Sequence, residues 1–218
     1  MTGCPVVFDL DGTLIDSVPD IHAAVGRMLE AEGFAPLSVA EVSSFVGNGV
    51  GVLIEKVSQA VGVADAERRS AMLERFRTEY EARPSYKTVT YAGVREALAA
   101  LVDAGHRLGI CTNKPEAISR SILGNLGLAG FFDTVVGGDS LAVRKPDPQP
   151  LYAAFAALGG EGLYVGDSEV DGETAAAAGV TFLLYTEGYR KSGLDEIAHR
   201  RAFSDFGLLP GLVRELAR

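Results

Sequence analysis

Residues 6–16 read Val6-Val7-Phe8-Asp9-Leu10-Asp11-Gly12-Thr13-Leu14-Ile15-Asp16, and they carry the clearest structural signal in the chain. Apolar residues that stop at a turn signal predict a buried strand, and open α/β sheets bind their ligands at the carboxyl ends of strands. Side chains two residues apart on a strand point the same way, so we expect Asp9 and Asp11 to share one small site. Two carboxylates this close repel each other unless a proton or a cation lies between them. Either one could instead cap a turn or the next helix.

The composition is typical of a globular protein that binds neither nucleic acid nor membranes. The chain has 218 residues, of which 47% are hydrophobic and 22% charged, enough for one core plus a smaller inserted domain. A formal net charge of −9 disfavours polyanionic partners, so an anionic substrate would need local cations. No signal-peptide pattern and no apolar run of about 18 residues is present, and we expect a cytoplasmic protein. Cys4 and Cys111 lie in separate apolar runs, which predicts reduced thiols.

Hydrophobic periodicity divides the chain into two parts. Residues 17–84 show helical patterning without a convincing strand, and Gly47-Asn48-Gly49-Val50-Gly51 interrupts it. After residue 84, strands alternate with helical segments of about ten residues, which indicates right-handed βαβ units. The predicted strands are 107–112, 134–136, 162–167 and 180–185. The predicted fold class is therefore α/β, with a Rossmann-like parallel sheet core (1–16 and 85–218), helices on both of its faces, and an inserted small α-helical cap domain (17–84).

Polar side chains follow several of these strands, and parallel strands bring their carboxyl ends to one edge of a sheet. Oxygens from Asp9, Asp11 and Asp167 would make a hard cation site of the kind that suits Mg²⁺. Thr112, with neighbouring backbone N–H groups, and the ammonium of Lys145 can bind the oxygens of a phosphoryl group. A carboxylate beside such a group is placed for nucleophilic attack, and a second one can move the proton. The set predicts phosphoryl transfer, although each acid alone could be a helix cap.

Four segments resemble, in order, the motifs of the haloacid dehalogenase superfamily. They are Asp9-Leu10-Asp11-Gly12-Thr13-Leu14, Cys111-Thr112-Asn113-Lys114, Arg144-Lys145-Pro146-Asp147-Pro148 and Gly166-Asp167-Ser168-Glu169-Val170-Asp171. The resemblance covers essentially the whole chain, since the helical insertion is similar to that superfamily's cap. Within the superfamily the chain looks most like the bacterial phosphoglycolate phosphatases.

The resemblance implies a Mg²⁺-dependent phosphomonoesterase that hydrolyses 2-phosphoglycolate to glycolate and phosphate through an aspartyl-phosphate. Asp9 would attack phosphorus, and Asp11 would protonate the leaving oxygen and later deprotonate water. Mg²⁺ would be held by Asp9, the backbone carbonyl of Asp11 and Asp167. Asp171 and Ser168 would support these ligands from a second layer.

The same resemblance implies where the substrate binds. Thr112, Asn113 and Lys145 would hold the phosphoryl oxygens. The cap would close over the site, and Gly47, Asn48 and Gly49 would contact the leaving group, although this loop could equally be a plain turn between helices. Lys56 could meet a substrate carboxylate, but a solvated surface lysine is the simpler interpretation.

Other functions could use the same residues. A pyrophosphatase, a sugar-phosphate phosphatase or a phosphohexomutase of the superfamily would share them, so only the cap discriminates. A phosphoacceptor signalling domain also places acids, Thr and Lys around Mg²⁺, but the inserted cap argues against it. A binding protein without activity is expected to lack Asp9 or Asp11. We therefore expect a small anionic phosphate ester as partner, no nucleic acid or membrane, and a monomer or homodimer.

Overall fold

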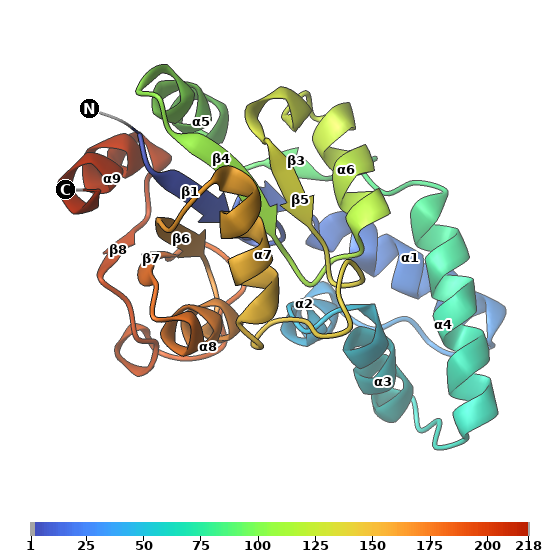
Figure 1. The fold of residues 1–218 in the computed structure, drawn as a ribbon. Helices are drawn as coiled ribbons and strands as arrows, with labels where there is room; N and C mark the ends of the chain where they lie inside the picture. The colour runs from blue at the N-terminus through green and yellow to red at the C-terminus, as the bar shows by residue number, and fades with distance from the viewer. Residues whose placement is uncertain (1–2, 218) are drawn as a thin grey trace. The chain divides into compact units, whose positions relative to one another are not determined.

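The computed structural model describes residues 3–217 of the chain. Contacts among these residues form two compact units (Figure 1). Ser17–Val89 form one, here called the helical unit, and the rest of the described chain forms the other, here called the core unit. Within residues 3–217, no helix combines the length and the apolar character that crossing a membrane requires.

The core unit is built on a six-stranded sheet in which all neighbouring strands are parallel (Figure 1). Its order is β5-β4-β1-β6-β7-β8. The strands are β1 (Pro5–Phe8), β4 (Arg107–Cys111), β5 (Thr134–Val136), β6 (Leu163–Gly166), β7 (Thr181–Tyr185) and β8 (Arg201–Phe203). Central β1 pairs with β4 and β6, with Val7 in register with Gly109 and Tyr164. Because both of its edges are paired and both of its faces are covered, β1 reads as a continuous apolar run.

Helices cover both faces of the sheet. Successive side chains of β1 pack into two separate apolar clusters, one on each face. Val6 and Phe8 belong to a cluster with α5 (Val94–Asp103), α6 (Glu116–Asn125) and α9 (Leu209–Leu216). Val7 belongs to the other, with α7 (Gln149–Leu158) and α8 (Glu169–Ala178). Because side chains alternate between the two faces of a strand, β1 contributes residues to both cores. Three 3₁₀ turns complete the described part of the unit: η1 (Ala129–Phe131), η2 (Leu194–Glu196) and η3 (Phe206–Leu208).

The helical unit contains α1 (Val18–Ala31), α2 (Val39–Phe45), α3 (Val50–Ala60) and α4 (Ala66–Glu81). Ser38 and Glu41 form a capping box at the start of α2, and Asp65 caps α4 by accepting from the N–H of Arg68 at 2.7 Å. Buried Asp20 in α1 accepts from the backbone N–H groups of residues 87 and 88. This ties the returning chain to the first turn of α1.

The α/β class, the parallel sheet and the helical insertion after the first strand are confirmed. Short β2 (Ile15–Asp16) and β3 (Val89–Thr90) flank the insertion and pair as a two-stranded sheet. Their pairing was not predicted, because two residues are too few for a periodic pattern to be visible.

Candidate active site

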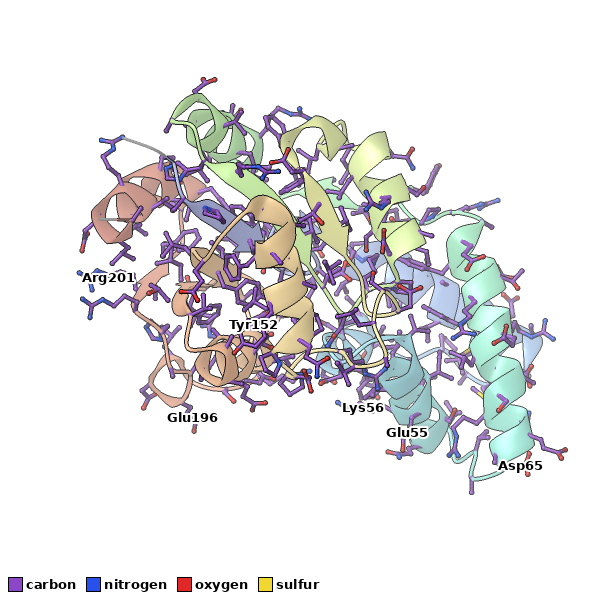
Figure 2. The ribbon with its side chains drawn as sticks, in the orientation of Figure 1. Glu55, Lys56, Asp65, Tyr152, Glu196 and Arg201 are labelled. Atoms are coloured by element: carbon purple, nitrogen blue, oxygen red, sulfur yellow. The ribbon has the colours of Figure 1, made fainter. Side chains whose placement is uncertain are left out.

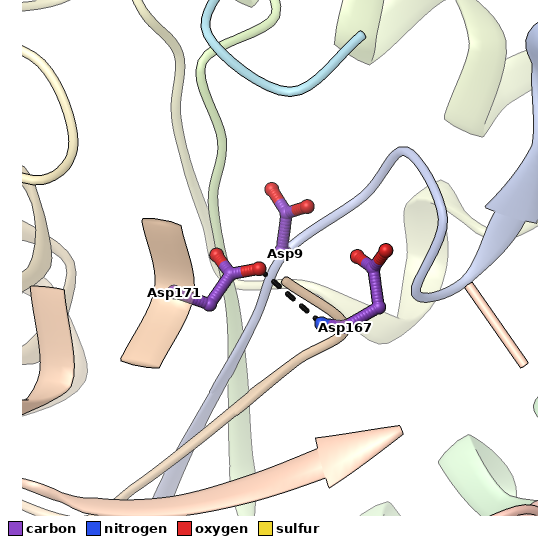
Figure 3. A group of neighbouring side chains, drawn as sticks. All are labelled: Asp9, Asp167 and Asp171. Atoms are coloured by element: carbon purple, nitrogen blue, oxygen red, sulfur yellow. Dashed lines mark hydrogen bonds between the residues drawn. The ribbon is translucent and has the colours of Figure 1, made fainter. Parts of the chain in front are cut away.

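Adjacent strands β1, β4 and β6 end at the same edge of the sheet, and each is followed by a polar residue, Asp9, Thr112 and Asp167 respectively. The sheet extends one residue past β1, since the N–H of Asp9 donates to the carbonyl of Val165 at 2.8 Å. Asp171 in the first turn of α8 joins the group. One carboxylate oxygen from each of Asp9, Asp167 and Asp171 lies within 4.8 Å of the others, and all three residues are buried (Figure 3).

Lys145 supplies a positive charge inside this acidic cluster. Its ammonium donates to Asp9 Oδ1 and Asp171 Oδ1, both at 2.7 Å, and to the hydroxyl of Tyr164 at 2.8 Å. Burial alone would lower the pKa of Lys145, but the carboxylates of Asp171 and Asp9 raise it above its usual value. The carbonyl of Lys145 accepts from Asn113 Nδ2 at 3.0 Å. Lys145 is therefore a fixed, permanently charged group beside Asp9.

Both carboxylate oxygens of Asp171 are occupied by donors from the protein. Oδ1 accepts from Lys145 and from the Tyr164 hydroxyl, the latter at 2.7 Å. Oδ2 accepts from the N–H groups of Asp167 and Ser168 at 3.2 and 3.1 Å and from the Ser168 hydroxyl at 2.7 Å. Burial would raise the pKa of Asp171, but Lys145 and these hydrogen bonds hold it below its usual value. Asp171 is thus an ionised group that fixes its neighbours.

Asp167 lies against two glycines, which allow the chain to approach its carboxylate closely. Oδ1 accepts from the Thr13 hydroxyl at 2.8 Å, and Oδ2 accepts from the N–H of Tyr189 at 2.6 Å. Gly12 has φ of +90°, and a Cβ there would lie 2.4 Å from Asp167 Oδ2; a Cβ on Gly188 would lie equally close. The loop after β1 therefore requires glycine for both conformation and space.

The electrostatics of the cluster favour a cation. Burial raises the pKa of Asp9 to about 6, against the opposing effect of Lys145. Burial and the neighbouring charges of Asp171 and Asp9 raise the pKa of Asp167 well above its usual value. Three carboxylates face a single ammonium, and their hard oxygen donors suit a divalent metal ion. Each oxygen of Asp171 accepts at least two hydrogen bonds, whereas each oxygen of Asp167 and Oδ1 of Asp9 accept one among the contacts described, so Asp9 and Asp167 are the side chains suited to hold it.

Asp11 forms an ion pair that the sequence did not predict. Lys114 Nζ lies 3.0 Å from Oδ1 and 3.1 Å from Oδ2 of Asp11. The side chain of Lys114 is only 4% exposed and that of Asp11 only 13%. The backbone N–H of Lys114 also donates to the Thr112 hydroxyl at 3.3 Å. The segment after β4 is therefore joined to Asp11 in the loop after β1.

The candidate residues fall into two groups by position. Those in the core unit lie in the loops that follow its strands or at the start of α8: Asp9, Asp11, Thr112, Asn113, Lys145, Asp167, Ser168 and Asp171. Gly47, Asn48 and Gly49 lie in the helical unit between α2 and α3. Gly47 and Gly49 have φ of +114° and +84°, so this turn depends on glycine. Its contact with a substrate stays a prediction.

With this geometry established, comparison with known proteins identifies the family. A model of the haloacid dehalogenase-like hydrolases matches residues 6–185, from β1 to the end of β7. The chain belongs to this family.

This haloacid dehalogenase-like hydrolase is similar to named relatives over its whole length, which confirms the resemblance drawn from its motifs. It is 54% identical to a phosphoglycolate phosphatase of Cereibacter sphaeroides, over 97% of this chain and 98% of that protein. It is 40% identical to a phosphoglycolate phosphatase of Rhodobacter capsulatus, over 95% of each. A crystal structure of a predicted phosphoglycolate phosphatase from Haemophilus somnus superposes with a TM-score of 0.90, at 28% identity, covering 95% of this chain and 96% of the other.

Several residues of this hydrolase that surround the site had no predicted role. Thr13 and Lys114 lie inside segments that carry the resemblance, so their position was visible but their partners were not. Tyr189 lies in the loop after β7. Tyr164 lies within the apolar run of β6, where nothing distinguishes it from a core residue. Its hydroxyl nevertheless contacts both Lys145 and Asp171.

Proposed function

We propose that this hydrolase is a Mg²⁺-dependent phosphatase that converts 2-phosphoglycolate and water to glycolate and phosphate, with an aspartyl-phosphate on Asp9 as intermediate. The observation that carries the chemistry is the buried Asp9 carboxylate, 2.7 Å from the Lys145 ammonium and clustered with Asp167. The full-length similarity to enzymes named phosphoglycolate phosphatase supports the substrate.

In the first half of the reaction, an Asp9 oxygen attacks phosphorus and the bond between phosphorus and the ester oxygen breaks. Asp11 gives its proton to the departing glycolate oxygen. In the second half, Asp11 takes a proton from water as the water oxygen attacks phosphorus, and phosphate leaves with Asp9 restored. Atoms and charges balance, because Asp11 ends each cycle as it began.

Other residues hold the transferred group rather than react. Lys145, Thr112 and Asn113 bind the phosphoryl oxygens, with Lys145 kept in place by Asp171 and Tyr164. Asp9, Asp167 and the Asp11 carbonyl would hold Mg²⁺, which would supply positive charge to neutralise the nucleophile and the phosphoryl group. Ser168 and Asp171 act through the residues they hold.

Residues 17–84 of the helical unit act as the cap in this proposal and move as one body, with Gly47, Asn48 and Gly49 meeting the leaving group. Closure over the core excludes water other than the hydrolytic one. The enzyme works in the cytoplasm as a monomer or homodimer.

Phosphate release from a panel of esters tests the proposal. The panel contains 2-phosphoglycolate, pyrophosphate, glucose phosphates and nucleoside monophosphates, each assayed with Mg²⁺ and again with EDTA. We expect Mg²⁺-dependent turnover with kcat/KM for 2-phosphoglycolate at least about tenfold above the others, equal to about 1.4 kcal/mol of transition-state preference. A flat profile would contradict the substrate, and release that persists in the Asp9→Asn variant would contradict the nucleophile.

A further inference from the structure

The core unit places a second buried ammonium beside the proposed reaction centre, and the proposed chemistry leaves it without a task. Lys145 contacts Asp9, Asp171 and Tyr164 and serves the phosphoryl group. Lys114 contacts both oxygens of Asp11 at 3.0 and 3.1 Å, with 4% of its side chain exposed. A lysine is rarely buried this fully unless it has a specific anionic partner.

We propose that Lys114 binds the carboxylate of the leaving group and so selects phosphate esters that carry an acid next to the ester oxygen. This inference rests on the proposed function and deepens it, because it names the residue that distinguishes 2-phosphoglycolate from uncharged esters. It makes Lys114 a specificity-determining residue of the core unit.

The geometry supports this role through Asp11. In the proposed reaction Asp11 touches the ester oxygen, and Lys114 lies one hydrogen-bond length beyond Asp11. In 2-phosphoglycolate a single methylene carbon separates the ester oxygen from the carboxylate, so the two lie about 3 Å apart, close to one hydrogen-bond length. Lys114 now contacts both oxygens of Asp11, and one contact to Asp11 and one to the substrate carboxylate would bind the two together.

Charge gives a second argument. The chain carries a net charge of −9, so its overall field repels a substrate with three negative charges. The phosphoryl group has Lys145 and the metal site, but a leaving-group carboxylate that enters a closed site also needs its own cation, since an unpaired buried charge is strongly unfavourable. Lys114 is a cation that is already buried and can donate hydrogen bonds to a carboxylate.

Lys56 is the rival for this task, because a cap lysine could also meet the substrate carboxylate. It lies on α3 in the helical unit and is partly exposed (Figure 2). Its partial exposure contrasts with the side chain of Lys114, which is only 4% exposed. The two lysines make different predictions, so one set of variants separates them.

The experiment compares two esters on the full-length enzyme with Mg²⁺: 2-phosphoglycolate and ethyl phosphate, which has a methyl group in place of the carboxylate. Lys114→Met removes the charge and keeps the length of the side chain. We expect it to lower kcat/KM for 2-phosphoglycolate at least about 30-fold more than for ethyl phosphate, equal to about 2 kcal/mol of lost discrimination. Lys114→Arg keeps a positive charge and should restore part of the preference, and Lys56→Met should leave the ratio of the two esters unchanged.

Equal losses on both esters in Lys114→Met would overturn the inference, because a lysine that only positions Asp11 affects every ester alike. Loss of the preference in Lys56→Met instead would overturn it in favour of the helical unit. Calorimetric binding of 3-phosphonopropionate and propylphosphonate, unreactive analogues with and without the carboxylate, gives a second measurement that does not depend on turnover. A preference for the carboxylate analogue that disappears in Lys114→Met supports the inference even if the wild-type enzyme fails to hydrolyse 2-phosphoglycolate, which would defeat only the proposed function.

Discussion

At the scale of single residues, the site is a chain of charges in which every member depends on its neighbour. Asp171 keeps Lys145 charged, and Lys145 in turn opposes the burial that raises the pKa of Asp9 to about 6. Tyr164 lies between them, with its hydroxyl 2.8 Å from Lys145 Nζ and 2.7 Å from Asp171 Oδ1. Removing any one member leaves a buried polar group without its partner, which is why single substitutions here should have large effects.

Asp9→Asn tests the nucleophile. An amide cannot form the aspartyl-phosphate, so we expect kcat to fall at least about 1,000-fold. The side chain keeps its shape, and the melting temperature should change little. Steady-state phosphate release together with a thermal melt checks both statements, and substantial turnover by a correctly folded variant would remove Asp9 from its role.

Tyr164→Phe tests the network behind the nucleophile. The substitution removes a hydrogen-bond partner from Lys145 and from Asp171, which are both buried. We therefore expect the free energy of unfolding to fall by about 1–3 kcal/mol. Tyr152→Phe is the matched control, because Tyr152 on α7 is 48% exposed and its hydroxyl lies 3.4 Å from the carbonyl of Ala178 (Figure 2). In urea denaturation, the free energy of unfolding of this control should change by less than about 0.5 kcal/mol. Equal changes in the two variants would mean that the network contributes nothing.

At the scale of elements, the strand–loop units do the positioning, and the loop after β1 is the most constrained of them. Gly12 combines a positive φ with a close approach to Asp167. Thr13 in the same loop donates to that carboxylate, so backbone and side chain from one turn fix Asp167, the second proposed metal ligand. This explains why a short stretch carries so much of the sequence signal.

Gly12→Ala separates the two constraints on that loop. It introduces both an unfavourable φ and a clash with Asp167, whereas Gly33→Ala at φ of +77° has no atom within 4 Å of the new methyl group. We expect backbone strain alone to lower the free energy of unfolding of the control, Gly33→Ala, by about 1 kcal/mol. Gly12→Ala should lower it further and should also weaken Mg²⁺ binding at least about tenfold. Chemical denaturation and calorimetry measure the two quantities. Similar losses of stability in Gly12→Ala and Gly33→Ala would show that the close approach of residue 12 to Asp167 imposes no constraint of its own.

The strands and their polar ends could be predicted from the sequence, because apolar runs followed by acids or glycine are local signals. Thus the segments 107–112 and 162–167 contain β4 and β6, and the polar residues after them lie at one edge. The partners of those residues could not be predicted. Nothing local in β6 marks Tyr164 as a polar contact, and the pairing of Lys114 with Asp11 joins residues 103 positions apart. Short β8 also escaped prediction, because Arg201-Ala202-Phe203 lacks the apolar, β-branched character that marks the equally short β5.

At the scale of the whole molecule, protonation of the acidic cluster and metal binding oppose each other. The pKa of Asp9 is about 6 and that of Asp167 is also raised, so protons compete with a metal for the same oxygens. Below about pH 6 the carboxyl group of Asp9 holds a proton in the folded protein, and above it Asp9 is free to bind a cation. Without metal, the raised pKa of Asp9 makes its contribution to stability fall as the pH increases from about 4 through about 6.

Mg²⁺ titrations at several pH values test this competition. We expect the dissociation constant for Mg²⁺ to rise at least about tenfold for each pH unit below about 6, because each bound metal ion displaces at least one proton. At pH 7.5 a concentration of Mg²⁺ about 100 times the dissociation constant should stabilise the fold by about 2.7 kcal/mol. Calorimetry gives the first quantity and denaturant melts with Mg²⁺ or EDTA the second. An affinity that stays constant between pH 5 and 7 would show that these carboxyl groups do not bind the metal.

The place of β1 in the sheet has a consequence for how the chain acquires its structure. Strand β1 is synthesised before β4 and β6, which hold it in the sheet and begin at Arg107 and Leu163. Its apolar residues and its two unpaired edges must therefore wait until most of the chain has been synthesised, while the helical unit, built from local contacts, can form earlier. Chains stopped before residue 163 should expose this strand to aggregation, so the segment that carries the proposed nucleophile is also the one most in need of protection during synthesis.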